Sequence, residues 1–363
     1  MKIHAAVAFG AGEPFRIEEC ELSAPGPGEM LVELLACGIC HTDLAAKDHG
    51  MGTPLPAVLG HEGTGIVREL GEGVSGFAPG DRVLMSFGAC GSCPSCSNRK
   101  PSYCQHVFTF NLLGTRVDGS SPVSLRGQPL TGHFFAQSSF ASHAVVSVTN
   151  AVRLDDDLPP ELMAPLACGV QTGMGTVVNV LQAGPQDSVA VFGCGTVGLS
   201  AVIAARIRGC RRIIAVDLNE ARLTLARELG VTDTINPAGQ DLAAALAALG
   251  GASRAFDTTG VTAVIETAFN SLHPLGMLVC AGVSPHGSKI TLDPVALMPT
   301  GRMIRGTIEG DAVPREFIPQ MIGWYREGLL PLEKLVKTYP FAAINEAAAD
   351  MDAGRVVKPV LLM

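Results

Sequence analysis

The sequence predicts an α/β protein in which a β-rich part is joined to a doubly wound parallel sheet. Over the first 150 residues, short β-branched runs at 30–35, 65–70 and 82–85 are separated by turn signals such as Pro25-Gly-Pro-Gly28, a texture typical of all-β structure. From about Gln171 onward, apolar strands alternate with helices, which is typical of a parallel sheet covered by helices on both faces.

In the second part, predicted strands and helices alternate and are joined by short connections. A strand at 188–192 leads into a helix that reaches Arg208, and a strand at 212–217 leads into a helix over 219–229. Further strands are expected at 255–257 and 277–280. After about Thr300 the elements become shorter, and a strand-like run occupies 356–362. We therefore expect the last segment of the chain to complete the β-rich part.

The composition is that of a compact enzyme. The 363 residues suffice for two domains, and 47% of them are hydrophobic while 17% are charged. A net charge of −8 without a basic run excludes the electrostatic footprint of a nucleic-acid-binding protein. No stretch of about 18 apolar residues lacks a charge, Gly or Pro, and residues 1–13 lack the apolar core of a signal peptide. We expect a soluble, cytoplasmic protein that binds neither nucleic acid nor membranes.

Four of the eleven cysteines form a tight cluster. Two residues separate Cys90 from Cys93 and Cys93 from Cys96, and Cys104 follows after seven more. This spacing lets four thiolates converge tetrahedrally on one Zn²⁺ ion, the complete ligand set of a closed structural site. A pair of disulfides is the alternative, but half-cystines this close would strain the loop.

A glycine-rich motif predicts a dinucleotide site. Gly193-Cys-Gly195-Thr-Val-Gly198 follows a predicted strand and opens a predicted helix, whose N-terminus would face a pyrophosphate. Asp217 ends the next strand, where its carboxylate can bind the adenosine ribose hydroxyls. Because an acid there repels a ribose 2′-phosphate, NAD is favoured over NADP. Arg222, one turn into the following helix, is expected to flank the ribose.

A second set of metal ligands is dispersed along the chain. Cys40, His61 and Cys168 are far apart in sequence, as the three protein ligands of a catalytic zinc with an open fourth position usually are. Alone, each would more often be an ordinary buried side chain. Their combination with the cysteine cluster and the glycine motif favours a metal site.

With these motifs the chain resembles the zinc-dependent medium-chain alcohol dehydrogenases over essentially its whole length. The family's zinc signature corresponds to Gly60-His61-Glu62-Gly-Thr-Gly65, with Gly71 and Val74 after it. Segments 133–141, 308–319 and 335–339 resemble in particular the aryl-alcohol (benzyl-alcohol) dehydrogenase branch. The resemblance implies a GroES-like catalytic domain with the structural zinc lobe over 1–169, a Rossmann NAD-binding domain over 170–305 and a returning segment of the catalytic domain over 306–363.

The resemblance also implies two zinc ions per chain, NAD as cofactor and a role for each site residue. The alcohol would bind the catalytic zinc as an alkoxide and pass a hydride reversibly to the nicotinamide. Thr42 would hold the alcohol proton, Asp43 would hydrogen-bond His61, and Glu62 would lie behind the metal and approach it during ligand exchange. The remaining roles are pyrophosphate contacts for His41 and Lys358, nicotinamide contacts for Thr172 and Val283, and substrate contacts for Phe87, Phe134 and Phe135.

One position departs from the family pattern. Members with the fullest proton relay carry a histidine five positions after the first zinc cysteine, where this chain has Ala45. The route of the proton beyond Thr42 is therefore open. His49 lies nearby in sequence, but a surface-loop histidine is the simpler interpretation.

Three functions compete. The first is oxidation of primary aromatic or allylic alcohols, because aromatic rings suit planar substrates. The second is oxidation of a terpenoid or aliphatic alcohol or of hydroxymethyl-glutathione, although no basic residue for the last is identified at the pocket mouth. The third is a non-catalytic nucleotide-binding relative, which the retention of every zinc ligand together with Asp43 and Thr42 argues against. We expect a small-molecule alcohol or aldehyde as the substrate and a homodimer or homotetramer as the assembly.

Overall fold

The computed structural model describes residues 1–363 as two compact units. The first unit comprises Met1–Cys168, Val313–Arg326 and Pro331–Met363, and the second comprises Gly169–Ala312 and Glu327–Leu330. This division differs from the expected domain limits mainly after the last parallel strand, since residues 306–312 lie in the second unit. The chain thus leaves the first unit at Cys168 and later returns to it, as the sequence pattern predicts.

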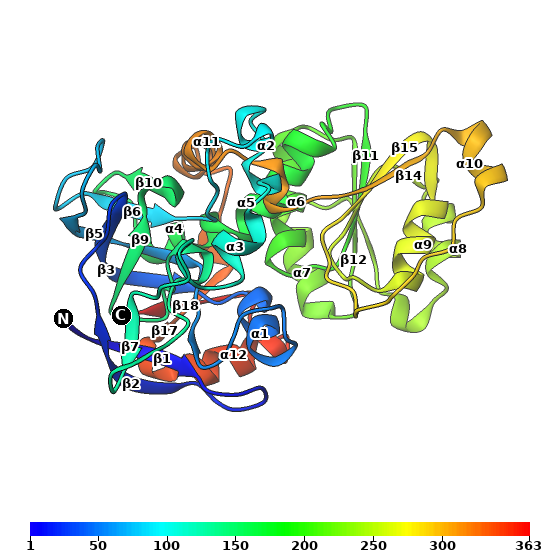
Figure 1. Ribbon diagram of the computed structural model, residues 1–363. Coiled ribbons are helices and arrows are strands. Elements are labelled where there is room, and N and C mark those ends of the chain that lie inside the picture. Colours follow the sequence, from blue (N-terminus) through cyan, green and yellow to red (C-terminus); the bar gives the residue numbers. More distant parts are fainter. The chain divides into compact units, whose positions relative to one another are not determined.

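The first unit is built from two sheets (Figure 1). One has the order β4-β1-β2-β7-β8, and the other runs β10-β6-β5-β3-β18-β17 with β9 also paired to β3. The strands are β1 (Lys2–Ala8), β2 (Arg16–Leu22), β3 (Glu29–Gly38), β4 (Ala57–Val58), β5 (Glu62–Leu70), β6 (Arg82–Met85), β7 (Val123–Leu125), β8 (Gln128–Pro129), β9 (His143–Ser147), β10 (Ala151–Leu154), β17 (Val336–Pro340) and β18 (Lys358–Leu362).

The helices of this unit are short where they precede the second unit and longer after it. They are α1 (His41–Asp48), α2 (Pro94–Ser97), α3 (Val107–Asn111), α4 (Pro160–Met163), α11 (Pro314–Arg326) and α12 (Ile344–Asp352). The all-β texture expected for the first 150 residues is interrupted by α1. It forms because Cys40 is an extended N-cap whose amide donates to Asp43 Oδ2 at 2.9 Å, and because the alanines within the helix favour it.

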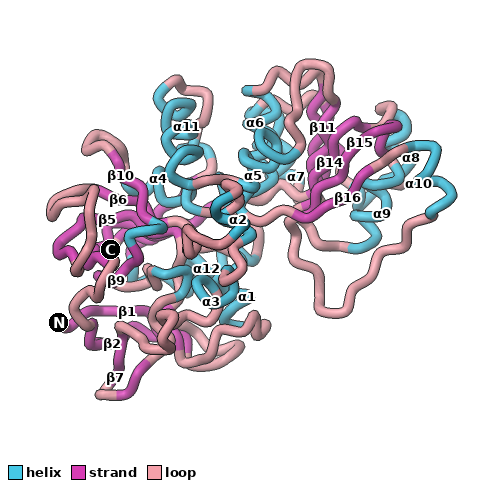
Figure 2. The backbone as a smooth tube through the Cα atoms, turned by 45° about the horizontal axis from the view of Figure 1, so that its top comes forward, coloured by secondary structure: helices cyan, strands magenta, loops and turns pink.

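The second unit is a six-stranded parallel sheet with the order β13-β12-β11-β14-β15-β16. Numbered within this unit the order is 3-2-1-4-5-6, which is the doubly wound Rossmann arrangement. The strands are β11 (Ser188–Phe192), β12 (Arg212–Val216), β13 (Asp233–Ile235), β14 (Ala252–Asp257), β15 (Leu272–Cys280) and β16 (Met303–Gly306). Figure 2 shows these strands side by side in magenta.

Helices cover both faces of this sheet (Figures 1 and 2). They are α5 (Gly169–Gly175), α6 (Thr196–Ile207), α7 (Glu220–Leu229), α8 (Leu242–Ala248), α9 (Thr262–Asn270) and α10 (Pro294–Thr300). Phe192 and Ile214 of the sheet share one buried cluster with Leu246 of α8 and Phe269 of α9. Burial of this apolar surface, about 25 cal/mol per Å², holds the layers together. No helix of the structure combines the length and the apolar character that a membrane span needs.

Candidate active site and metal-binding clusters

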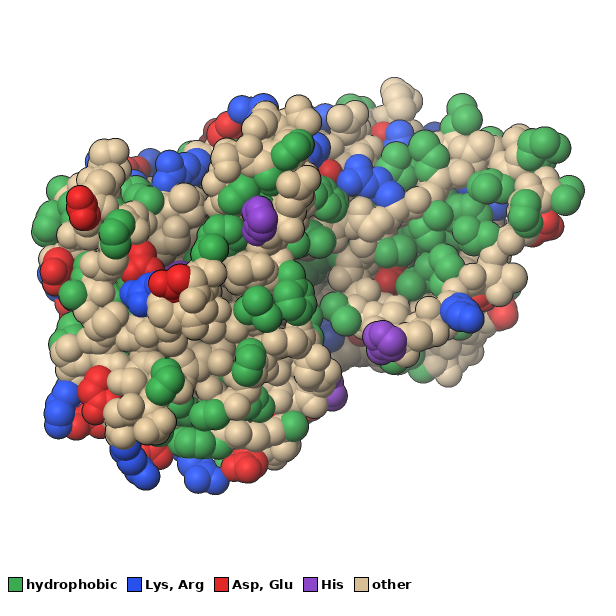
Figure 3. Space-filling model, viewed as in Figure 1, with side chains coloured by type: hydrophobic (Ala, Val, Ile, Leu, Met, Phe, Trp, Pro, Cys, Tyr) green, Lys and Arg blue, Asp and Glu red, His purple; other side chains and the backbone are tan.

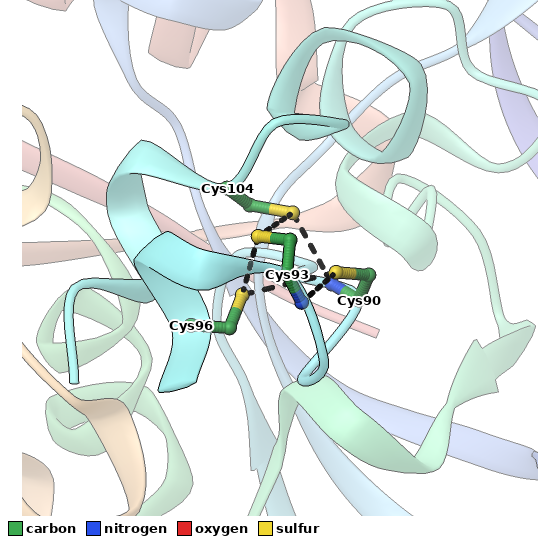
Figure 4. Close-up of side chains that lie close together, drawn as sticks. All are labelled: Cys90, Cys93, Cys96 and Cys104. Carbon is green, nitrogen blue, oxygen red and sulfur yellow. Dashed lines mark hydrogen bonds between the residues drawn. The ribbon is translucent and has the colours of Figure 1, made fainter. Parts of the chain in front are cut away.

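Four cysteine sulfurs converge in the lobe that contains α2 and α3 (Figure 4). The Sγ–Sγ distances are 3.9 Å for Cys90–Cys96, 3.6 Å for Cys93–Cys96 and 3.9 Å for Cys93–Cys104. A tetrahedron of sulfurs around zinc with bonds of about 2.3 Å has edges of about 3.8 Å. All four thiols are free, so the disulfide alternative is wrong. The donor set therefore fits a structural zinc ion.

The lobe is also prepared electrostatically for thiolates. Backbone amides of Ser92 and Cys93 donate to the Cys90 sulfur and lower the pKa of that thiol to about 6. The backbone amide of His106 donates to the Cys104 sulfur at 3.4 Å. Amide donors stabilise the charged sulfur that a metal requires.

The dispersed ligands also come together within the first unit. One donor atom from each of Cys40, His61, Glu62 and Cys168 lies within 4.8 Å of the others. Cys40 precedes α1, His61 and Glu62 lie at the start of β5, and Cys168 follows the 3₁₀ turn Ala164–Ala167. Residues from three separate segments thus form one cluster of two thiols, an imidazole and a carboxylate, the ligand types that zinc prefers.

Asp43 sets the orientation of His61. Its Oδ1 lies 2.8 Å from His61 Nδ1 and accepts the Gly60 amide at 3.1 Å, and both side chains are completely buried. His61 Nε2 is consequently left buried without any hydrogen-bond partner. An orphaned ring nitrogen that faces two thiols fits a metal ligand, because leaving it unpaired would otherwise be costly.

The Cys40 thiol is similarly prepared for a metal. The neighbouring Cys168 thiol and His61 imidazole lower the pKa of Cys40 well below its usual range, although burial opposes the shift. A thiolate is thus favoured beside His61, as zinc binding requires.

Lys358 is paired with a residue of the ligand cluster. Its Nζ is buried and donates to both carboxylate oxygens of Glu62, at 2.9 and 2.8 Å, and to Ile39 O at 3.0 Å. Its expected contact with a pyrophosphate stays a prediction. Burial raises the pKa of Glu62 to about 7, while the charge of Lys358 opposes the shift. The Glu62 carboxylate in the ligand cluster is thus paired with the positive charge of Lys358.

Two aromatic rings lie against His61. The Phe135 ring stacks on the imidazole with centroids 4.4 Å apart, and the Phe134 ring meets it edge-on at 5.7 Å. The two phenyl rings contact each other at 4.8 Å. Phe87 is buried in the same hydrophobic cluster as both. The structure thus brings Phe134 and Phe135 against the candidate metal site.

The glycine motif has the conformation that a dinucleotide-binding turn needs. Gly193 has φ +90°, and a Cβ at Gly198 would lie 1.8 Å from Gly193 O, so no larger residue fits there. Gly195 is the N-cap of α6, and a Cβ there would meet nothing within 4 Å, which leaves the backbone amides approachable. The end of the helix can therefore receive a phosphate.

The acidic partner of this turn is in place. Asp217 directly follows β12, and its oxygens accept the Cys194 amide at 2.6 Å and the Asn219 amide at 2.7 Å. These bonds fix the carboxylate beside the glycine turn. Arg222 lies in the first turn of α7, and its buried Nε has no hydrogen-bond partner.

The other expected residues are placed as follows. Thr42 Oγ1 lies 3.7 Å from Cys40 Sγ, and His41 is exposed at the first position of α1. In the second unit, Thr172 is buried with its hydroxyl 3.4 Å from Glu309 Oε2, and Val283 is 72% exposed. His49 is the exposed C-cap of α1, in accord with a surface histidine.

Sequence reasoning missed the polar side chains that support the site. Gln137 and Ser86 are fully buried and hydrogen-bonded to the segments that carry the ligands. The only sequence signal is a glutamine inside the apolar run Phe134-Phe-Ala-Gln137. Such a residue must find partners when it is buried.

A doubly wound sheet with this glycine turn, together with a two-thiol and imidazole cluster, defines a zinc-dependent dehydrogenase with an NAD-binding domain. The family model for the alcohol dehydrogenase GroES-like domain matches residues 26–156, and that for the zinc-binding dehydrogenase matches residues 196–327. The chain belongs to the zinc-dependent alcohol dehydrogenases of the medium-chain family.

Relatives align along nearly the whole chain. Geraniol dehydrogenase of Castellaniella defragrans is 42% identical over 99% of this chain and 97% of its own length. The crystal structure of benzyl alcohol dehydrogenase from Acinetobacter calcoaceticus superimposes with a TM-score of 0.96 at 39% identity, covering 100% of this chain and 99% of that one. Alcohol dehydrogenase 1 of Pisum sativum is 36% identical over 100% of this chain and 97% of its own. The protein is thus an alcohol dehydrogenase that acts on small molecules.

Proposed function

We propose that the protein oxidises primary alcohols whose carbinol carbon is attached to an aromatic ring or a carbon–carbon double bond, reversibly and with NAD as hydride acceptor. The observation that carries this proposal is the Phe134–Phe135 pair beside His61, with Phe135 stacked on the imidazole and Phe134 edge-on to it. Ring faces beside a metal ligand favour flat, unsaturated substrates. Geraniol and benzyl alcohol, for which two of the relatives are named, both have this chemistry.

The chain's own residues would prepare the alcohol for hydride loss. Zinc, when bound by Cys40, His61 and Cys168, supplies the Lewis acidity that lowers the pKa of the substrate hydroxyl. We assign the proton to Thr42, whose hydroxyl lies close to the Cys40 sulfur. Asp43 holds the imidazole of His61 in one tautomer and one orientation.

We propose NAD rather than NADP because of the negative charge of Asp217. The Asp217 carboxylate is fixed at the end of β12, where a ribose 2′-phosphate would meet a negative charge at short range. Gly193, Gly195 and Gly198 would receive the pyrophosphate at the start of α6. Arg222 would flank the ribose, Thr172 and Val283 would contact the nicotinamide, and His41 would approach the pyrophosphate.

A simple aliphatic alcohol is the second candidate substrate, because the 36% identical relative from Pisum sativum is named only as an alcohol dehydrogenase, without a particular alcohol. A steady-state panel of benzyl alcohol, geraniol, hexanol, ethanol and hydroxymethyl-glutathione, each with NAD and with NADP, separates the candidates. We expect kcat/KM for benzyl alcohol and geraniol to exceed that for ethanol by about 10- to 200-fold or more. Equal or higher values for ethanol would refute the aromatic and allylic assignment.

Shortening Phe135 tests whether the Phe134–Phe135 pair determines the substrate preference. Phe135→Ala should lower kcat/KM for benzyl alcohol more than for ethanol, since only the larger alcohol loses ring contact. Phe15→Leu is the matched control: Phe15 is buried and packs on Phe140 at 5.8 Å, without contact to His61. It should lower stability without changing the ratio between the two alcohols.

We also propose that the protein is a homodimer in the cytoplasm. Strand β16 is an unpaired sheet edge, and a two-fold axis beside it would pair it with its own copy. Figure 3 shows hydrophobic side chains gathered where Figure 1 draws α10; Leu275, Val295, Met298 and Met303 are exposed in this region. The cytoplasmic location is proposed because the cysteines are free, which favours a reducing compartment. Light scattering should give twice the chain mass, and Met303→Lys should give the monomer.

A further inference from the structure

The aromatic pair belongs to a strained segment. Phe135, Ala136 and Ser138 have φ values of +53°, +55° and +55°, in the left-handed region that residues other than glycine rarely adopt. Such backbone persists only where the surroundings determine it. The position of the Phe135 ring therefore depends on the contacts that fix the backbone of residues 135–138.

One completely buried amide holds this segment to the zinc-ligand turn. Gln137 Nε2 donates to His61 O at 3.0 Å, Met85 O at 3.2 Å and Ser86 O at 3.0 Å. Its Oε1 accepts the Gly63 amide at 3.2 Å and the Ser139 hydroxyl at 2.7 Å. A single side chain thus connects the segment that bears Phe135 with the backbone of His61 and Gly63.

The network extends to the third zinc ligand. Asn150 Nδ2 donates to Phe135 O at 3.0 Å, to Ala136 O at 3.3 Å and to Ser86 O at 3.1 Å. Ser86 Oγ donates to Ala167 O at 2.6 Å, the residue before Cys168. Buried hydrogen-bond networks of this kind favour one arrangement of the chain.

We propose that Gln137 is a positioning residue that holds the Phe134–Phe135 wall and the backbone of His61 as one rigid piece. It thereby sets the width of the substrate pocket and the rate at which the catalytic metal is lost. The substrate part of this inference rests on the proposed function, whereas the metal part does not.

The test compares Gln137→Met, which keeps the length and removes all hydrogen bonds, with a matched control. Tyr339→Phe removes a buried hydroxyl that donates to Asp350 Oδ2 and bonds neither His61, Phe135 nor a cysteine of either cluster. Each variant is characterised by its melting temperature, by kcat and KM for benzyl alcohol and ethanol, and by zinc transfer to a chromogenic chelator.

We expect Gln137→Met to release the first zinc about 10- to 100-fold faster, the usual effect of removing support from a metal ligand. The ratio of kcat/KM for benzyl alcohol over ethanol should fall about tenfold or more, chiefly through KM. Tyr339→Phe should change neither, even where its melting temperature falls as far.

Two results overturn the inference: a folded Gln137→Met enzyme with unchanged zinc release and alcohol ratio, or the same changes in Tyr339→Phe. Where Gln137→Met does not fold, Asn150→Leu replaces it, because it frees Phe135 O and Ala136 O from the same network. A wild type that prefers ethanol would refute the proposed substrate, while the zinc-release comparison would still decide the role of Gln137.

Discussion

His133 should make the stability of the first unit pH-dependent between pH 6.5 and 4.5. The imidazole is 5% exposed, and burial lowers its pKa to about 4. A backbone hydrogen bond with Thr115 and the charge of Glu29 oppose this shift, while the charge of Arg116 adds to it. Arg116 already donates to both oxygens of Glu29, at 2.7 and 2.8 Å, so that carboxylate does little to attract a second cation.

The direction and size of this pH dependence follow from the protonation of His133 in the unfolded and folded states. In the unfolded chain His133 takes up a proton near its ordinary pKa of about 6.5, whereas the folded protein binds that proton only near pH 4. Stability is therefore complete above pH 6.5 and is lost as the pH falls toward 4. The difference of about 2.5 pH units corresponds to at most about 3 kcal/mol, or roughly 6–12 °C for a domain of 150–250 residues.

The assay is the melting temperature of wild type and His133→Asn from pH 8 to 4.5. Asparagine keeps a donor near Nδ1 and does not titrate, and loss of zinc at low pH affects both proteins alike. We expect the variant to be less stable at pH 8 and the gap to close or reverse by pH 4.5. Parallel curves across the whole range would refute the reasoning.

Three further predictions concern the site. Mild chelation should abolish turnover before it lowers the melting temperature. The reason is that the four-cysteine cluster forms a closed metal site, whereas the cluster of Cys40, His61 and Cys168 keeps an open position. Simultaneous loss of turnover and thermal stability would contradict this. Asp217→Ser should raise the kcat/KM ratio of NADP over NAD, and a wild type that already prefers NADP would show the assignment to be wrong. Thr42→Ala should reduce kcat by about 100- to 10,000-fold with an unchanged Kd for NADH in a fluorescence titration, and unchanged turnover would mean that the proton leaves by another route.

The fold could be predicted from the sequence because its signals are local. Strand–helix alternation and the glycine motif indicated the doubly wound sheet, and the family model and solved relatives confirm the fold class. Helix α1 was missed because the capping by Asp43 depends on one short-range contact inside a β-rich stretch. The limits of the second unit differ at 306–312 because Gly310 packs on Gly175, a contact between distant positions.

The site was predictable only where residue type and spacing carry the chemistry. Zinc ligands and the glycine turn have such patterns, and the structure brings both ligand sets together. The pairing of Lys358 with Glu62 could not be predicted because a lone lysine gives no sign of its partner, and the pairing depends on strand β18 lying beside β3. Gln137 was overlooked for the same reason, since its five partners come from three separate stretches of the chain.

The pairing of Glu62 with Lys358 has a consequence for biosynthesis. The two residues are 296 positions apart, and the whole parallel sheet of the second unit lies between them in the chain. A nascent chain that has emerged as far as Cys168 already contains every ligand of the catalytic cluster, but it does not yet contain Lys358. Because that ammonium donates to both Glu62 oxygens, we expect the centre to reach its final arrangement only after β18 is translated. The NAD-binding unit can therefore fold on the ribosome first, and the catalytic centre is completed only afterwards.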